Sequence, residues 1–312
     1  MHFVIPGGSG QVGSLLTRDL RAKGHRVTTI GRGPGGEDHL QWDGRTLGAW
    51  ASVLDGADVV INLAGRSVNC RYNEENLKAM MDSRVHSTTI VGEAIAQCSS
   101  PPALWLQMST ATIYAHRFDA PNDEETGIMG GHEDGVPAYW KRSTDIAEAW
   151  EKALELAECP ATRKVALRTS MVMTADKDGI FSVLLSMVRR RLGGSIAGGE
   201  QYVSWIHGDD FVRAIEFLVA REDINGAVNL AAPNPLPQRD FMKAMREAAG
   251  ISLGLPAAAW MAKVGAVFMR TDAELLLKSR RVVPGRLLAA GFEFTFASWR
   301  EAAADLLARS KG

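Results

Sequence analysis

The chain has 312 residues, of which 46% are hydrophobic and 23% are charged. A chain of this length and composition can bury a full core, and it suits one large domain or two unequal ones. Its formal net charge of −1 gives no electrostatic reason to expect a nucleic-acid partner or an anionic membrane surface.

The cysteine pattern and the apolar runs of the sequence indicate in which cellular compartment the protein is expected. Cys70, Cys98 and Cys159 are far apart, odd in number and in no C-x-x-C arrangement, which argues against a disulfide framework and against a zinc site. The first residues begin a predicted strand without an apolar leader, and no apolar run approaches the roughly 20 residues of a membrane-spanning helix. We therefore expect a cytoplasmic protein that holds no metal and contacts no membrane.

The first half alternates short β-branched runs with longer amphipathic stretches. Strands are expected at residues 2–6, 26–30, 58–63, 104–108 and 165–172, and helices begin near Val12, Leu47, Asn73 and Tyr139. Each strand run is apolar on both faces, as in strands that helices cover on either side. The pattern predicts an α/β fold with a doubly wound parallel sheet. Residues 115–137 form a long polar connection, and a loop of that length is usually functional.

The alternation loosens after residue 174. We expect helices at 179–190 and 209–220, strands at 202–205 and 227–230, and a mainly helical segment at 239–312 with a short aromatic strand at 292–296. The strand near 227–232 is expected to return to the main sheet. The chain is therefore divided into a larger domain at 1–174 and a smaller, mainly helical domain at 175–312.

A glycine-rich turn, PGGSGQVG, directly follows the first predicted strand. Glycines permit this tight turn, let a pyrophosphate approach the backbone, and let the following helix pack closely while its N-terminal amides face the anion. The strand before the turn and the helix after it favour dinucleotide binding over a bare structural turn. The residues expected to hold the cofactor here are Gly7, Gly8, Gly10, Gln11, Val12 and Gly13.

The end of the second predicted strand indicates which dinucleotide binds. The sequence TIGRGPGG carries Arg32 where an acidic residue would bind the ribose 2′-hydroxyl of NAD, and no carboxylate occurs before Glu37. An arginine suits a 2′-phosphate, so NADP(H) is expected, the alternative being an exposed loop arginine. Trp42 and Asp43 are expected to close over the adenine. In the motif NLAG, Leu63, Ala64 and Gly65 end another strand at the edge where cofactors lie.

Several segments resemble a known family over essentially the whole chain. PGGSGQVG, NLAG, MSTATIY and SWIHGDD resemble the extended short-chain dehydrogenase/reductases of the sugar-nucleotide epimerase and dehydratase type. The segments EENLKAMMDSRV, NLAAPNP and RRVVPGRLLAAGFEF narrow the resemblance to the atypical branch called epimerase family protein, which carries a C-terminal domain of unknown function. The resemblance implies a Rossmann sheet of about seven parallel strands, NADP(H) in the glycine turn, and a substrate pocket between the sheet and the smaller domain.

The resemblance also implies a catalytic pattern from which this chain departs. In the superfamily a Ser or Thr orients the substrate, and a Tyr-x-x-x-Lys helix supplies the acid and base. The family pattern places Thr110 at the orienting position, with Ser109 before it, Trp140 at the tyrosine position and Thr144 at the lysine position. Indole is no acid near neutral pH and threonine carries no charge, so the standard pair of residues cannot operate. Typical members of the branch also lack this pair.

Other residues are candidates for the missing proton donor. Tyr114 and His116 follow the strand that carries Thr110, and Tyr139 lies one residue out of register with Trp140. Packing of Tyr139 as a buried aromatic is favoured over a displaced acid. For His207 the sequence HGDD suggests a metal cluster, but N-capping of the next helix by Asp209 or Asp210 is favoured.

Two arginines, Arg84 and Arg168, are expected near the cleft. A guanidinium there would hold a phosphate or carboxylate of the ligand, the alternative being a structural pair with an acidic side chain. The leading hypothesis is an NADPH-dependent oxidoreductase or epimerase-like enzyme that acts on a small carbonyl or sugar-like substrate. The alternative is a catalytically inactive module that senses NADP(H). Superfamily relatives often dimerise through helices matching 73–97 and 139–158, so a homodimer is an open expectation.

Overall fold

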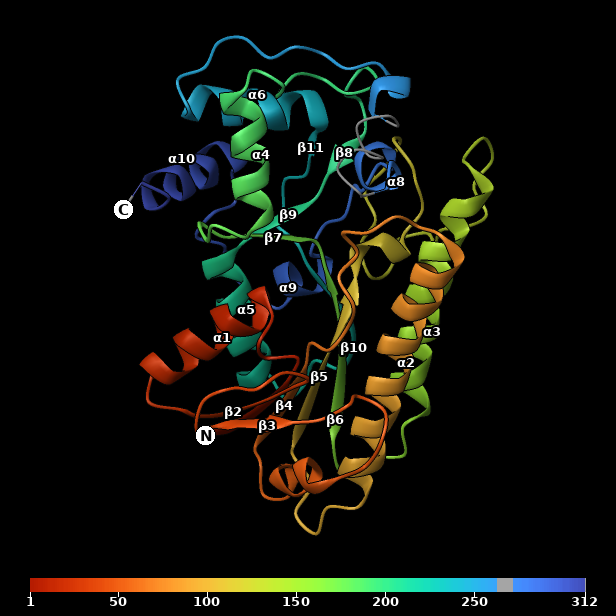
Figure 1. The fold of residues 1–312 in the computed structure, drawn as a ribbon, viewed down its shortest axis with the longest axis vertical. Coiled ribbons are helices and arrows are strands. Elements are labelled where there is room, and N and C mark those ends of the chain that lie inside the picture. The colour runs from red at the N-terminus through yellow and green to blue at the C-terminus, as the bar shows by residue number, and fades with distance from the viewer. Residues whose placement is uncertain (263–271, 312) are drawn as a thin grey trace.

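A parallel sheet of seven strands forms the centre of the computed structural model, which describes residues 1–262 and 272–311 (Figure 1). Its strands are β1 (His2–Pro6), β2 (Arg26–Gly31), β3 (His39–Gln41), β4 (Val59–Asn62), β5 (Leu104–Thr110), β6 (Arg163–Thr169) and β10 (Gly226–Leu230). Their spatial order is β10-β6-β5-β4-β1-β2-β3, and every neighbouring pair is parallel. The order reverses beside β1, and open sheets of this kind bind ligands at that point. The expected doubly wound sheet is confirmed, including the returning strand β10.

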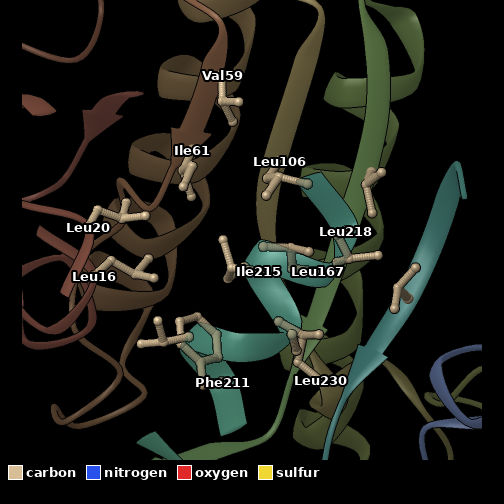
Figure 2. Packing of buried hydrophobic residues seen from close by; sticks show 14 of the residues in the cluster. Leu16, Leu20, Val59, Ile61, Leu106, Leu167, Phe211, Ile215, Leu218 and Leu230 are labelled. Atoms are coloured by element: carbon tan, nitrogen blue, oxygen red, sulfur yellow. The ribbon is translucent and has the colours of Figure 1, made fainter. Parts of the chain in front are cut away.

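Helices cover both faces of this sheet (Figure 1). Helices α1 (Gln11–Ala22) and α5 (Gly208–Ala220) pack on one face, while α2 (Glu74–Ala96), α3 (Lys141–Leu156) and the 3₁₀ helix η1 (Ala49–Leu54) lie toward the other. Alternate residues of a strand point to opposite faces, so Phe3 and Ile5 enter the first core layer and Val4 enters the second. Figure 2 shows the first layer, where Ile215 of α5 faces residues from β4, β5 and β6.

A smaller unit lies beyond the carboxyl ends of the strands (Figure 1). It contains α4 (Ile180–Arg189), α6 (Gln238–Ala248), α8 (Glu274–Leu277), α10 (Trp299–Arg309), and the strands β7 (Met171–Met173), β8 (Tyr202–Val203), β9 (Trp205–His207) and β11 (Leu236–Pro237). The core of this unit is aromatic, with Phe241 stacked on Trp299 at a centroid distance of 4.1 Å. The short helix α9 (Gly285–Ala289) returns to the main sheet (Figure 1), where its Leu287 joins the first core layer. Within the two described ranges, every helix is too short or too polar to cross a membrane.

Four local predictions differ from the structure. The helix expected near Leu47 is the short 3₁₀ helix η1, and the strand expected at 202–205 is divided into β8 and β9. The run at 165–172 is divided into β6 and β7, because β7 leaves the main sheet to pair with β9. The aromatic segment 292–296 is no strand: its Thr295 and Phe296 amides donate to the Asp210 carboxylate instead of to a neighbouring strand.

We predict that Ile215→Ala lowers the free energy of unfolding by about 2–5 kcal/mol, because Ile215 is fully buried between α5 and the sheet and its loss leaves a cavity. Ile128→Ala is the matched control. Its side chain is 54% exposed, so it should change stability by less than about 0.5 kcal/mol. Urea denaturation of both variants measures the difference, and equal losses would contradict this packing.

Candidate active site

The glycine turn between β1 and α1 is held by backbone contacts that a side chain would break. Gly7 has a φ of +80°, and a Cβ there would lie 2.6 Å from the Ala64 nitrogen. A Cβ on Gly13 would lie 2.5 Å from the Gly8 Cα, so α1 can approach the turn this closely only because residue 13 is a glycine. The turn therefore contacts both the N-terminal end of α1 and the NLAG segment after β4.

The N-terminal end of α1 presents free backbone donors beside an open surface. Ser14 is the first residue of the helix whose amide donates to a carbonyl within the turn, that of Gly10 at 2.8 Å. The amides of Gln11, Val12 and Gly13 have no acceptor among the described residues, and the first turn contains no acidic side chain. A Cβ on Gly10 would meet only the Gly7 carbonyl oxygen, at 3.4 Å. These donors are therefore available to an anion, and binding of the pyrophosphate here stays a prediction.

The side chains of the turn have other roles. The Gln11 amide nitrogen donates to Thr174 Oγ1 at 3.0 Å, which joins the turn to the segment after β7. The Val12 side chain packs against the core below the sheet. Both residues therefore offer a cofactor their backbone amides and not their side chains.

An open groove of about 600 Å³ continues from the turn along the ends of α1 and β2. Its wall includes Ser9, Arg18, Arg21 and His39, of which the sequence analysis named none. Arg18 and Arg21 lie three residues apart on α1, which is the helical spacing that signals a shared face. Arg32 is exposed just beyond β2, and its guanidinium makes no hydrogen bond or ion pair within the described residues, so it can contact a phosphate.

The expectation that Trp42 and Asp43 close over the adenine does not fit the structure. Trp42 is buried in the core, where its ring packs edge-on against Trp50 at 5.0 Å, so it faces away from solvent. The Asp43 carboxylate accepts hydrogen bonds from the Thr46 and Arg45 amides and from the Thr46 hydroxyl. These bonds lower the pKa of Asp43 to about 2 and hold the turn after β3.

The NLAG segment lies beside a buried arginine. The Asn62 side chain donates to Gln107 and accepts from the Ala64 amide, which shapes the turn containing Leu63, Ala64 and Gly65. A Cβ on Gly65 would lie 3.5 Å from the Arg84 guanidinium.

Arg84 itself is only 9% exposed, lies over the Trp150 ring at 4.8 Å and donates to the Met80 carbonyl. Burial lowers its pKa to about 10. It makes no ion pair with any carboxylate of the described residues, so a buried positive charge remains at the ligand edge of the sheet.

Arg168 forms a structural pair with an acidic side chain, which is one of the two alternatives that the sequence left open. It makes a bidentate ion pair with Glu151, with distances of 2.9 and 2.8 Å, and donates to the Tyr114 hydroxyl at 2.9 Å. Ser109 donates to the same carboxylate, and Tyr114 donates to Asn229. Because burial also raises the pKa of Tyr114, this network fixes the end of β5 and offers no mobile proton. We therefore assign Ser109, Tyr114 and Arg168 to the framework of the site.

Thr110 ends β5 with a usable hydroxyl. Its Oγ1 accepts from the Thr112 amide at 3.2 Å, which leaves the hydroxyl hydrogen free to donate. The residue is half-buried at the carboxyl end of the sheet, which is where the resemblance places the group that orients a substrate.

Trp140 and Thr144 occupy the two positions at which the superfamily has its tyrosine and lysine. Trp140 is buried edge-on against His116 at 5.2 Å, and its indole N–H has no partner among the described residues. The Thr144 hydroxyl donates to the Lys141 carbonyl oxygen. A Cβ on Gly131 would lie 2.6 Å from the Thr144 Oγ1, so the loop after β5 occupies the space that a lysine at position 144 would need.

The two remaining candidates for the proton donor, Tyr139 and His116, lack the features of an activated acid or base. Tyr139 is 41% exposed, so it is not the buried packing aromatic that we expected, and partial burial raises its pKa. The His116 Nδ1 accepts from the Ser279 amide at 2.7 Å, and burial lowers the pKa of the imidazole. Neither residue is activated as a base or an acid by a neighbouring charge of the kind that lysine provides in the superfamily.

Three residues beside this site were missed from the sequence. Glu274, Lys278 and Arg280 belong to the C-terminal segment, yet they hydrogen-bond Ser143 of α3 and Thr112 after β5. Charged residues at the end of a short helical stretch are typical of a solvated surface, so nothing local in the sequence marks their burial. The only signal was the segment RRVVPGRLLAAGFEF, which begins at Arg280 and contributed to the family resemblance.

The N-cap of α5 is His207 and neither of the two aspartates. Its Nδ1 accepts from the Asp209 amide at 3.1 Å, while its Nε2 lies 3.1 Å from Asp305. Neither aspartate caps the helix. The fully buried Asp210 carboxylate accepts from the Thr295 and Phe296 amides, and Asp209 forms an ion pair with Arg309.

We predict that Gly13→Ala lowers the free energy of unfolding by about 1–3 kcal/mol, because its new methyl group would overlap the Gly8 backbone. Gly10→Ala is the matched control and should stay within about 0.5 kcal/mol of the parent, since its methyl group meets almost nothing. Urea denaturation without nucleotide measures both. Similar losses in the two variants would show that α1 does not approach the turn this closely.

Comparison with known proteins supports the resemblance. Residues 3–231 match the model of the NAD dependent epimerase/dehydratase family, and residues 257–306 match a domain of unknown function, DUF1731. Epimerase family protein SDR39U1 of Bos taurus is 32% identical over 99% of this chain and 100% of its own length. Epimerase family protein YfhF of Bacillus subtilis is 28% identical over 100% of this chain and 99% of its own length.

A solved structure extends the similarity to the whole fold. The crystal structure of human epimerase family protein SDR39U1 (isoform 2) with NADPH has a TM-score of 0.86 and 28% identity, covering 100% of both chains. The glycine turn, the seven-stranded sheet and the C-terminal segment are therefore parts of one shared architecture, and the chain belongs to the NAD-dependent epimerase/dehydratase family.

Proposed function

We propose that the protein is an NADP(H)-dependent oxidoreductase or epimerase-like enzyme acting on a small carbonyl or sugar-like substrate. The observation that carries this proposal is the group of unpaired amides at Gln11, Val12 and Gly13 beside the open face of Gly10. The similar human protein was crystallised with NADPH, which supports the same ligand here.

The residues present fit this cofactor along its whole length. The α1 amides would hold the pyrophosphate, and the free guanidinium of Arg32 would hold the 2′-phosphate. The NLAG segment and the buried charge of Arg84 would face the nicotinamide half. When bound, NADPH supplies a hydride to a carbonyl carbon.

The chain's own residues would orient the reacting group. Thr110 can donate its free hydroxyl hydrogen to a carbonyl oxygen, and β5 is held in place by the buried pairing of Glu151 with Arg168. Trp140, at the position of the superfamily tyrosine, cannot exchange protons near neutral pH. Positioning by these groups would carry much of the rate.

We predict that NADPH and NADP⁺ raise the melting temperature more than NADH, because a ligand at 100 times its Kd stabilises a protein by about 2.7 kcal/mol. Arg32→Ala should remove most of the preference for the phosphorylated forms. Arg190→Ala, at the exposed end of α4, is the matched control and should keep it. A melting temperature that responds to none of the nucleotides would refute the proposed cofactor.

Thr110→Val should reduce carbonyl turnover by about 100-fold or more, because valine keeps the shape and removes the donor that orients the oxygen. Its NADPH-dependent melting shift should be unchanged. Thr169→Val on the adjacent strand β6 is the control, since Thr169 is the register partner of Thr110 and its hydroxyl donates to the Leu167 carbonyl. Full turnover by Thr110→Val would remove Thr110 from the catalytic assignment.

A second candidate function is an NADP(H)-binding sensor without catalysis. The observation that favours it is the filled lysine position, where Gly131 packs against Thr144. A sensor would show the nucleotide-dependent melting shift and would consume no NADPH with any small aldehyde or ketone. Dimerisation through α2 and α3 stays a prediction for either function.

A further inference from the structure

The loop that carries Arg32 folds around one imidazole ring. This loop, residues 32–38, leaves the sheet at the end of β2 and returns to it at β3, whose first residue is His39. A Cβ on Gly35 would overlap the His39 ring and would lie 2.5 Å from the His39 Cβ. A Cβ on Gly31 would lie 2.9 Å from the His39 Cε1. The backbone before the loop and the backbone within it therefore both pack directly on this ring.

Both nitrogens of the His39 ring are hydrogen-bonded. Nε2 lies 3.0 Å from the Gly33 carbonyl oxygen, and because a carbonyl oxygen can only accept, Nε2 carries a hydrogen and donates it. Nδ1 lies 2.8 Å from the Thr29 hydroxyl, from which it accepts in the neutral ring. Gln41, on the same face of β3, donates to the Arg32 carbonyl oxygen at 2.9 Å. Two side chains of β3 therefore hold the consecutive carbonyls of Arg32 and Gly33.

The same ring is connected to the glycine turn of the cofactor site. The Thr29 side chain that bonds His39 also packs on Gly8, where a Cβ would lie 2.7 Å from the Thr29 methyl group. A Cβ on Gly31 would lie 3.1 Å from the Ser9 hydroxyl oxygen. Ser9 and His39 both line the open groove beside the turn. The ring thus fixes the position of the loop relative to the amides that would hold the pyrophosphate.

The loop needs this support because its own sequence supplies little rigidity. Three of its seven residues are glycines, whose backbones have the most conformational freedom to lose. Every residue from 32 to 38 is exposed, so hydrophobic burial does not offset the entropy cost of ordering the loop. Without the His39 contacts, Arg32 would have to become ordered when the ligand binds, and ordering at that step reduces affinity.

The position of the loop also determines which charge faces the groove. Besides Arg32, the loop carries Glu37 and Asp38, and both of these acidic residues line the groove. Arg21 pairs with the Asp38 carboxylate at 3.1 Å, whereas Glu37 makes no ion pair among the described residues. A phosphate is attracted here only while it lies closer to Arg32 than to Glu37. A displaced loop would therefore lose the preference for a phosphorylated ligand.

We propose that His39 is the positioning residue that sets the preference of this site for NADP(H) over NAD(H), a role that rests on the cofactor proposed above. Its imidazole holds the Gly33 carbonyl, and with it the backbone of Arg32, so that the guanidinium can contact the 2′-phosphate of the adenosine ribose. The 2′-phosphate is the only difference between the two dinucleotides. Loss of the His39 contacts should therefore weaken the binding of NADP(H) and leave that of NAD(H) almost unchanged.

The test is calorimetric titration of NADPH and of NADH into the parent and into His39→Phe. Phenylalanine keeps a ring between Gly31 and Gly35 but removes both hydrogen bonds. The Kd of NADPH should rise about tenfold, because a hydrogen bond is lost and the loop must be ordered on binding, while the Kd of NADH should change less than about twofold. His39→Gln keeps an N–H donor for the Gly33 carbonyl and should restore most of the preference.

The matched control is His2→Phe at the opposite end of the sheet. The His2 Nε2 lies 3.0 Å from Thr28 Oγ1, so this substitution removes a similar histidine–threonine bond and should leave both Kd values unchanged. A second pair of variants keeps His39 itself. Gly35→Ala would push the backbone off the ring and should lower the preference for NADPH. A Cβ on Gly36 would meet no other described residue within 4 Å, so Gly36→Ala should keep that preference.

The outcomes separate this proposal from the cofactor assignment. If the parent prefers NADPH and His39→Phe keeps that preference, the role of His39 is overturned and the cofactor assignment stands. If His39→Phe weakens NADPH and NADH equally, His39 only stabilises the fold, and its role in cofactor choice is again overturned. If the parent does not prefer NADPH, the cofactor assignment fails and the role of His39 falls with it.

Discussion

The whole site depends on how closely the glycine turn approaches its neighbours. With hydrogen atoms in place of side chains, Gly13 of α1 rests on the backbone of Gly8, and Gly7 rests on the backbone of Ala64. These contacts aim the amides of α1 at the switch point of the sheet, and they bring the NLAG segment and Arg84 to the same edge. A larger residue at Gly13 would displace the helix and with it the ligand surface, whereas one at Gly7 would collide with the Ala64 backbone.

The charged groups of the site divide into two sets with different roles. Below the carboxyl edge, Glu151 and Arg168 neutralise each other and hold Ser109 and Tyr114, so these groups are framework. The second set is Glu274, Lys278 and Arg280 of the C-terminal segment, in which Glu274 Oε1 lies 3.9 Å from both Lys278 Nζ and Arg280 Nη2. Lys278 and Arg280 also donate to Thr112, so this set joins the C-terminal segment to the end of β5.

The departure from the superfamily pattern has a structural counterpart. A lysine at position 144 would collide with the loop that carries Gly130 and Gly131. That loop follows β5 and is itself fixed by Glu133, which accepts from the Gly131 and His116 amides. This loop thus closes the space that a lysine at position 144 would fill, while Lys278 of the C-terminal segment donates to the Thr112 carbonyl oxygen.

Much of this protein could be read from its sequence because the relevant physics is local. The strand–glycine–helix order predicted the turn and its free amides, and the alternation of apolar runs predicted the sheet with its returning strand β10. Short elements were missed, such as β3, since three half-exposed residues carry too little periodicity. Trp42 was misplaced because its pairing with Trp50 depends on how η1 folds back on the sheet.

The sequence by itself determined the fold class, the glycine turn, the presence of Arg32 in place of a carboxylate, and the presence of Trp140 and Thr144 where the family resemblance expects tyrosine and lysine. Only the tertiary structure decided which charged side chains meet. Arg168 lies 17 residues from Glu151 and pairs with it, whereas Lys278 lies 166 residues from Thr112 and donates to its carbonyl oxygen. Contacts over such separations arise when the C-terminal segment folds over the carboxyl edge, and residue type and local periodicity carry no record of where a distant segment will pack.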